Sequence, residues 1–115
     1  MRRRGSIWLA NLNPGRGTEP GKTRPVLVVQ CQALLDAEHP STLIVPLTTR
    51  LVDDAEPLRL RLKAQGRIKQ DSDLLLDQLR AIDNKRLTDG PLLQCSVEFM
   101  ARVDSALKDV LDLPT

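Results

Sequence analysis

The feature that most constrains the fold of this chain is the apolar run PVLVVQC at residues 25–31, which directly follows a charged, glycine- and proline-rich loop. Four apolar side chains in a row, three of them valines, give a strand that must be buried on both faces. Such a strand needs a neighbour on each side. We therefore predict a central strand at residues 25–31, within a single domain spanning residues 1–115.

The rest of the chain offers few large side chains for a core. Its 115 residues include one Phe, one Trp and no Tyr, so Leu, Val and Ile must fill the interior. A domain of this size buries only about two-thirds of its unfolded surface. Association with a second copy would be an easy way to bury more.

Several further segments have the pattern of short strands. Residues 6–12 and 41–49 are apolar runs, and Pro46 in the second indicates an edge or a bulge. The stretch ALLDAEHP at residues 33–40 indicates a short helical turn that Pro40 ends. Residues 73–83 fit strand or helix, and we take them as one strand with a turn after it.

The segment at residues 58–63 alternates strictly between leucine and a cation. This period predicts a strand with its three leucines, Leu58 among them, in the core. The cations Arg59, Arg61 and Lys63 then share the solvent side.

The period changes to that of a helix after Ser96, which is a good N-cap residue. Met100, Val103, Leu107, Val110 and Leu111 recur at helical spacing. Several short strands, a charged loop and one C-terminal amphipathic helix together predict a mainly β fold, a small curled barrel with the helix packed across it.

Charge is distributed unevenly along the chain, although the net charge is only +2. Residues 1–70 hold 12 Lys/Arg against 6 Asp/Glu, whereas residues 71–115 hold 5 against 9. This asymmetry is consistent with one face suited to phosphates. Scattered charge that only keeps the protein in solution is the other interpretation, and composition alone favours it.

The loop ahead of the central strand carries more charge than a turn requires. Arg24 precedes a proline, which favours an extended backbone and holds the side chain at the start of the strand. Arg16 and Lys22 lie near it in sequence, with Glu19 between them. Two interpretations remain open: the cations clamp a phosphate while Glu19 aims them, or the charges pair with one another in a solvated loop.

Two other groups of polar residues end or follow apolar strands. Thr48 and Thr49 could donate hydrogen bonds to a phosphate oxygen, or could be there only because threonine favours strands. A second group surrounds the apolar triplet at residues 74–76; its members are Ser72, Asp77, Gln78 and Arg80. Asp77 could pair with Arg80 or another cation in a structural role.

Other kinds of site find little support. The single histidine, His39, precedes a proline in a loop, so no Ser-His-Asp or Cys-His nucleophile can be assembled. One histidine and two distant cysteines make a zinc site unlikely by ligand count, and we expect no metal or cofactor. The chain lacks a signal peptide and a long apolar run, so we expect a cytoplasmic protein without membrane contact.

In order along the chain, these segments resemble the MazF/PemK family of ribonuclease toxins from bacterial toxin–antitoxin modules. The opening RRGSIWLANLNPGRGTEPGKTRPVLVV is similar to the family's first motif, and IVPLTT matches its next strand. DSDLLLDQLRAIDNKRLTD resembles the third motif, after which the family also has an amphipathic helix. The likeness covers nearly the whole chain.

The resemblance implies an SH3-like barrel, a homodimer and metal-independent cleavage of single-stranded RNA. By position, Arg24 matches the family's catalytic arginine, Thr48 its catalytic threonine and Glu19 the loop acid near the site. Ser72, Gln78 and Arg80 match the motif that lines or shapes the RNA groove. With these, we expect Arg16, Lys22 and Thr49 to contact RNA.

The expected chemistry uses the 2′-hydroxyl of RNA as the nucleophile, which leaves a 2′,3′-cyclic phosphate and a 5′-hydroxyl. Arg24 would clamp the phosphate and could protonate the leaving oxygen, while Thr48 adds a neutral hydrogen bond. Glu19 is a weak candidate for the proton acceptor. The PemK/Kid branch has a histidine at the position of Thr18 and an arginine at that of Leu75, so this chain resembles the MazF-like branch.

The resemblance also implies a partner, a cognate MazE-like antitoxin whose flexible acidic segment covers the dimer. The cations Arg59, Arg61 and Lys63 would suit such a segment. Two alternatives remain: a CcdB-like toxin that poisons DNA gyrase without catalysis, and a non-catalytic RNA-binding barrel. The chain ends in LDLPT, without the Trp-Gly-Ile of the first, and its 2% aromatic content gives the second little to stack bases on.

Overall fold

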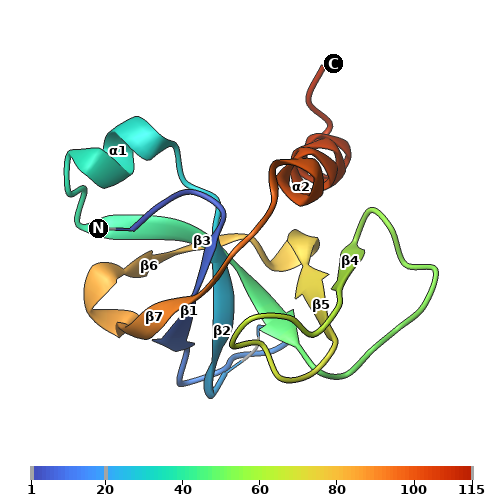
Figure 1. Ribbon diagram of the computed structural model, residues 1–115, viewed down its shortest axis with the longest axis horizontal. Coiled ribbons are helices and arrows are strands. Elements are labelled where there is room, and N and C mark those ends of the chain that lie inside the picture. Colours follow the sequence, from blue (N-terminus) through green and yellow to red (C-terminus); the bar gives the residue numbers. More distant parts are fainter. Residues whose placement is uncertain (1, 20, 115) are drawn as a thin grey trace.

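The computed structural model describes residues 2–19 and 21–114 (Figure 1). Strands dominate, and two α-helices accompany them. In chain order the elements are β1 (Ser6–Asn11), β2 (Thr23–Val28), α1 (Gln32–Asp36), β3 (Ser41–Thr48), β4 (Arg59–Leu62), β5 (Ser72–Leu75), the 3-10 turn η1 (Leu76–Gln78), β6 (Arg80–Asp83), the 3-10 turn η2 (Asn84–Arg86), β7 (Leu87–Gln94) and α2 (Val97–Leu111).

All the strand pairs are antiparallel, and the order across the sheet is β4-β5-β3-β2-β1-β7, with β6 paired to β3 beside this path. The prediction of a mainly β fold with a C-terminal helix is therefore confirmed. Figure 1 shows α1 and α2 on different sides of the strands. Neither helix of the described residues is long and apolar enough to span a membrane.

The predicted central strand is β2, which has β1 on one side and β3 on the other. Its successive side chains enter two different cores, as alternation requires. Leu27 belongs to the cluster that contains Val103 of α2, whereas Val26 and Val28 belong to the cluster that contains Leu35 of α1. Both faces of the strand are thus buried, which explains its unbroken apolar sequence.

Of the two expectations for Pro46, an edge or a bulge, the edge is wrong, because β3 pairs with other strands along both sides. On one side β6 pairs with Ser41–Ile44 and β5 with Leu47–Thr48, so Pro46 falls in the interval between them. A residue without an N–H fits where the partner strand changes.

The single strand predicted at residues 73–83 is also wrong; η1 divides the segment into β5 and β6. Leu74 pairs with Leu47 and Arg80 with Ile44. Six steps along this segment therefore match three steps along β3, and the 3-10 turn takes up the difference. A continuous strand could not keep both registers.

The strand predicted at residues 58–63 begins at Arg59, with Leu60 and Leu62 buried as expected. Leu58, however, is 51% exposed, because it precedes the strand and the alternation does not extend to it. The strand β7 was not predicted at all.

The C-terminal helix follows its prediction closely. The Ser96 hydroxyl accepts a hydrogen bond from the Phe99 amide at 3.1 Å, which confirms the N-cap. Val103 is fully buried. Leu111 is half-exposed, contrary to expectation, because it occupies the last turn beside the C-cap Asp112.

Candidate functional site

In the loop between β1 and β2, the backbones of two glycines, Gly15 and Gly21, lie in close contact with each other. A side chain on Gly15 would come within 2.8 Å of the Gly21 amide, and one on Gly21 within 2.7 Å of the Gly15 amide. The Asn13 side chain accepts a hydrogen bond from the Lys22 amide at 2.6 Å. These contacts fix where the chain re-enters β2, and so fix the position of Arg24.

Two backbone carbonyls hold the guanidinium of Arg24. Its Nε donates to the Gly21 carbonyl at 2.9 Å and its Nη1 to the Leu47 carbonyl at 3.2 Å. Neither acceptor carries a full charge, so the positive charge is oriented but not neutralised. Burial lowers the pKa of Arg24 from its ordinary value, although a guanidinium stays protonated at neutral pH.

The Arg24 side chain faces an open cavity of about 590 Å³ between the starts of β2 and β5 and the end of β3. Cations and hydroxyls line most of it. The lining residues are Lys22, Thr23, Arg24, Pro25, Leu47, Thr48, Thr49, Arg50 and Ser72. Five of the nine residues predicted for the site are thus brought together here, and Arg50 joins them without having been predicted.

Glu19 is not among these lining residues; its side chain lies near Arg80 instead. The Glu19 Oε2 lies 3.8 Å from Arg80 Nη1, an ion pair too long for a hydrogen bond. Nη1 is buried and has no hydrogen-bond partner among the described residues. Asp77 forms no ion pair among the described residues, either with Arg80 or with another cation, and the described ion pair of Arg80 is with Glu19.

The remaining two predicted residues also lie outside the cavity. Arg16 is exposed in the β1–β2 loop, where its carbonyl accepts from the Glu19 amide. Gln78 is half-buried at the end of η1. In this single chain neither contributes to the wall around Arg24.

A second cavity, of about 530 Å³, adjoins the first and shares Pro25, Thr49 and Ser72 with it. Arg67 and Lys69 lie along its wall, and its apolar residues are Leu9, Ile68 and Leu92. Asp89 also lines this second cavity and pairs with Arg67 at 3.1 Å, so Lys69 is the cation in its wall that has no ion pair among the described residues.

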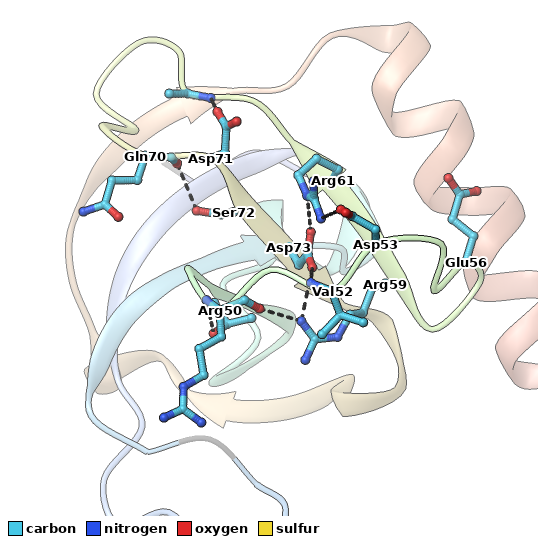
Figure 2. Close-up of polar contacts among 12 residues, drawn as sticks. Arg50, Val52, Asp53, Glu56, Arg59, Arg61, Gln70, Asp71, Ser72 and Asp73 are labelled. Atoms are coloured by element: carbon cyan, nitrogen blue, oxygen red, sulfur yellow. Dashed lines mark hydrogen bonds and ion pairs between the residues drawn. The ribbon is translucent and has the colours of Figure 1, made fainter.

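Behind the first cavity lies a buried carboxylate that sequence reasoning missed, Asp73, with a side chain 1% exposed. Arg61 donates to it through Nε at 2.6 Å and Arg59 through Nη1 at 3.1 Å (Figure 2). Arg61 also pairs with Asp53 at 2.8 Å. Of the three cations expected on the solvent side, Lys63 is exposed, whereas Arg59 and Arg61 are only partly exposed, because both pair with Asp73 on the adjacent strand.

Burial alone would raise the pKa of the Asp73 carboxyl. The hydrogen bonds that it accepts from Arg61, the Val52 amide and Arg59 have the larger opposite effect, so its pKa lies below the usual range. Hydrogen bonds to Asp73 and then to Asp53 raise the pKa of Arg61. Asp73 therefore remains ionised and its two arginines remain charged, each compensating the other.

The arrangement around Arg24 is suited to an anion with several oxygens. The three N–H donors of Arg24 that the two carbonyls leave available could form a fork on a phosphate. Thr48, Thr49 and Ser72 lie in the same wall, and the Ser72 hydroxyl already donates to the Gln70 carbonyl at 3.1 Å. Such a wall can bind a phosphodiester and stabilise charge that develops on it.

Comparison with known proteins agrees with this geometry. Residues 3–111 match the model of a family described as the PemK-like, MazF-like toxin of type II toxin–antitoxin systems. Endoribonuclease EndoA of Bacillus subtilis (strain 168) is 34% identical over 112 residues, which cover 96% of this chain and 95% of that protein.

Solved structures share the fold. MazF from Deinococcus radiodurans superposes with a TM-score of 0.79 at 23% identity, covering 96% of each chain. The Mycobacterium tuberculosis toxin MazF-mt6 gives 0.78 at 18% identity, covering 96% of this chain and 99% of that one. A mycobacterial endoribonuclease, solved in complex with its cognate antitoxin, gives 0.77 at 19% identity, covering 100% and 99%.

Proposed function

The chain belongs to the PemK-like, MazF-like family of toxins of type II toxin–antitoxin systems, and from that premise we propose that it is an endoribonuclease that cleaves single-stranded RNA, chiefly messenger RNA, without a metal ion. The relative EndoA, which matches along nearly its whole length, supports the reaction class. The cationic, hydroxyl-lined cavity around Arg24 supports the site.

The observation that carries the proposal is the way Arg24 is held. Its guanidinium donates hydrogen bonds to two neutral carbonyls and faces a cavity that Thr48 also lines. A side chain that served only to stabilise the fold would gain more from a carboxylate, as Arg59 and Arg61 do with Asp73. An oriented cation that has no counter-ion within the described part of the chain fits an anionic substrate.

In the proposed reaction the ribose 2′-oxygen attacks the adjacent phosphorus, and the bond from phosphorus to the 5′-oxygen of the next nucleotide breaks. The products are a 2′,3′-cyclic phosphate and a 5′-hydroxyl. Arg24 stabilises the extra negative charge on the non-bridging oxygens. The lowered pKa of Arg24 is in the right direction for partial proton transfer to the leaving oxygen, and Thr48 donates a neutral hydrogen bond.

The proton acceptor for the 2′-hydroxyl stays unassigned. Glu19 has a carboxylate, but it would have to leave Arg80 and approach Thr48 first. The adjoining second cavity gives the RNA strand room to continue past Thr49 and Ser72.

We further propose that the sheet closes into an SH3-like barrel, that two copies form a homodimer, and that an antitoxin silences the toxin. A relative's structure contains its cognate antitoxin, and MazE-MazF structures of Deinococcus radiodurans share this fold with a TM-score of 0.75. Because Asp73 compensates the charges of Arg59 and Arg61, we propose that an acidic inhibitor segment binds instead to Lys22, Arg24 and Arg50. Inhibitor and RNA then compete. Binding of both together at full affinity would contradict this.

The test is cleavage of a long single-stranded RNA in excess EDTA, with both new ends mapped. Cleavage at a short recurring sequence that leaves 5′-hydroxyl ends is the expected result. Replacing Arg24 by Ala should lower the rate by about 10²–10³, whereas Arg102→Ala, an exposed arginine on α2 paired with Glu56, should not. Absence of cleavage by the folded wild-type protein would point to the gyrase-binding alternative.

A further inference from the structure

Arg50 differs from Arg24 in that its backbone, rather than its side chain, is fixed by hydrogen bonds. Its amide donates to the Thr48 hydroxyl at 3.2 Å, and its carbonyl accepts from Arg59 Nη1 at 2.8 Å. The side chain itself lines the Arg24 cavity. Figure 2 shows it directed away from the Asp73 cluster, toward the β1–β2 loop.

The support for this segment comes from the buried carboxylate behind it. Asp73 Oδ2 accepts from the Val52 amide at 2.9 Å and from the same Arg59 Nη1 at 3.1 Å. One arginine nitrogen therefore bridges a buried carboxylate and the Arg50 carbonyl. Residues 50 and 52 are both tied to Asp73, and the chain between them cannot shift without breaking one of these bonds.

The charges in this region divide into two kinds. Arg59 and Arg61 are compensated by Asp73, while the Arg50 side chain has no hydrogen bond or ion pair among residues 2–19 and 21–114. Exposed and uncompensated, it shares the cavity wall with Arg24 and Thr48. A cation presented in this way is available to a second phosphate of the same strand.

We propose that Arg50 binds the RNA phosphate next to the scissile one, and that Asp73 and Arg59 are positioning residues that aim it. The proposal rests on the proposed function, since it assumes an RNA substrate in this cavity. Arg24 and Thr48 then act on the scissile phosphate, and Arg50 sets the register of the strand.

The test is a double-mutant cycle on RNA cleavage and binding, with the substitutions Arg50→Ala and Arg59→Gln made singly and together. Each single change should raise KM roughly tenfold with a smaller effect on kcat, because a positioned contact is lost. Each should also make the slope of log affinity against log salt concentration shallower by about 0.7, which is the contribution of one phosphate contact on a single strand. The double variant should be no worse than Arg50→Ala, because Arg59 acts only through Arg50.

Two control variants separate positioning from a general loss of structure. Arg61→Gln removes a partner of Asp73 but no bond to the Arg50 carbonyl, and Asp53→Asn removes only the outer end of the cluster. Both should leave KM within about twofold of wild type and should leave the salt slope unchanged. If Arg59→Gln does not fold, Arg50→Ala, an exposed change, still tests the phosphate contact.

An unchanged salt slope in Arg50→Ala, or strictly additive effects in the cycle, would overturn the inference. Failure of the proposed function looks different: wild-type protein would not cleave RNA at all. A wild type that cleaves, an Arg24→Ala variant that does not, and an Arg50→Ala variant indistinguishable from wild type would reject this inference alone.

Discussion

The arginines of the candidate site and those of the Asp73 cluster lie close together in the fold but are held in opposite ways. Arg24 is oriented by two neutral carbonyls and keeps its charge available. Arg59 and Arg61 are oriented by one buried carboxylate, so their charge is compensated within the protein. The partner of a cation, rather than its place in the sequence, decides whether it serves binding or folding.

The largest expected effect is on catalysis, from the change Arg24→Lys. Lysine keeps the charge but cannot bond both carbonyls and also present a fork to a phosphate. We expect a loss of roughly 10² in kcat/KM, with the free energy of unfolding nearly unchanged. Single-turnover cleavage alongside urea unfolding measures both. A lysine variant as active as wild type would mean that charge alone suffices and that orientation by the carbonyls is irrelevant.

The next largest effect is on stability, from Asp73→Asn. The amide keeps the shape of the carboxylate but leaves Arg59 without its described counter-ion and Arg61 with only the exposed Asp53. We expect a loss of about 2–3 kcal/mol in the free energy of unfolding, somewhat below the range for fully buried pairs because both arginines retain some exposure. Stability equal to that of wild type would show that the cluster is solvated rather than buried.

A smaller effect should appear in the dependence of stability on pH. Because the pKa of Asp73 is lowered in the folded protein, its contribution is present above the unfolded value of about 4 and is lost as pH falls through the folded pKa. Wild type should therefore lose stability below about pH 4 more steeply than Asp73→Asn does. Parallel curves for the two proteins from about pH 6 to about pH 2 would contradict this.

The smallest effect should come from Asp53→Ala, at the outer end of the same cluster. Asp53 is 81% exposed, so its pair with Arg61 is screened by water although the distance is only 2.8 Å. We expect a change below about 0.5 kcal/mol in the free energy of unfolding, which shrinks further in high salt. A loss of stability comparable to that of Asp73→Asn would mean that the exposed Asp53–Arg61 pair contributes as much to the free energy of unfolding as the buried carboxylate does.

The parts of the fold that followed from sequence are those whose signals are local. The buried run of β2 and the Ser96 cap of α2 depend on neighbouring residues alone, and both were predicted. The strand β7 was missed because its sequence, LTDGPLLQ, contains the Gly90–Pro91 pair that normally indicates a turn. It is a strand because β1 pairs with it, through two shifts of register.

The same difference between local and non-local sequence signals applies to the candidate site. Arg24, Thr48 and Ser72 were found because they belong to contiguous motifs, and the structure brings them to one cavity. Arg50 was missed because it follows the motif, and Asp73 because the chain around it alternates poorly and its arginine partners come from another strand. Pairing across strands at 12 and 14 residues' separation leaves no pattern in a single sequence.

The most direct measurement uses an RNA that contains one deoxyribonucleotide immediately 5′ to the mapped cut. We predict that this RNA binds as well as the all-ribose strand but is not cleaved there, since the attacking 2′-hydroxyl is gone, while the all-ribose strand yields a 2′,3′-cyclic phosphate. Cleavage of the deoxy-substituted strand at the same bond would mean that water or a protein group attacks the phosphate. The roles of Arg24 and Thr48 in activating an internal 2′-hydroxyl would then be wrong.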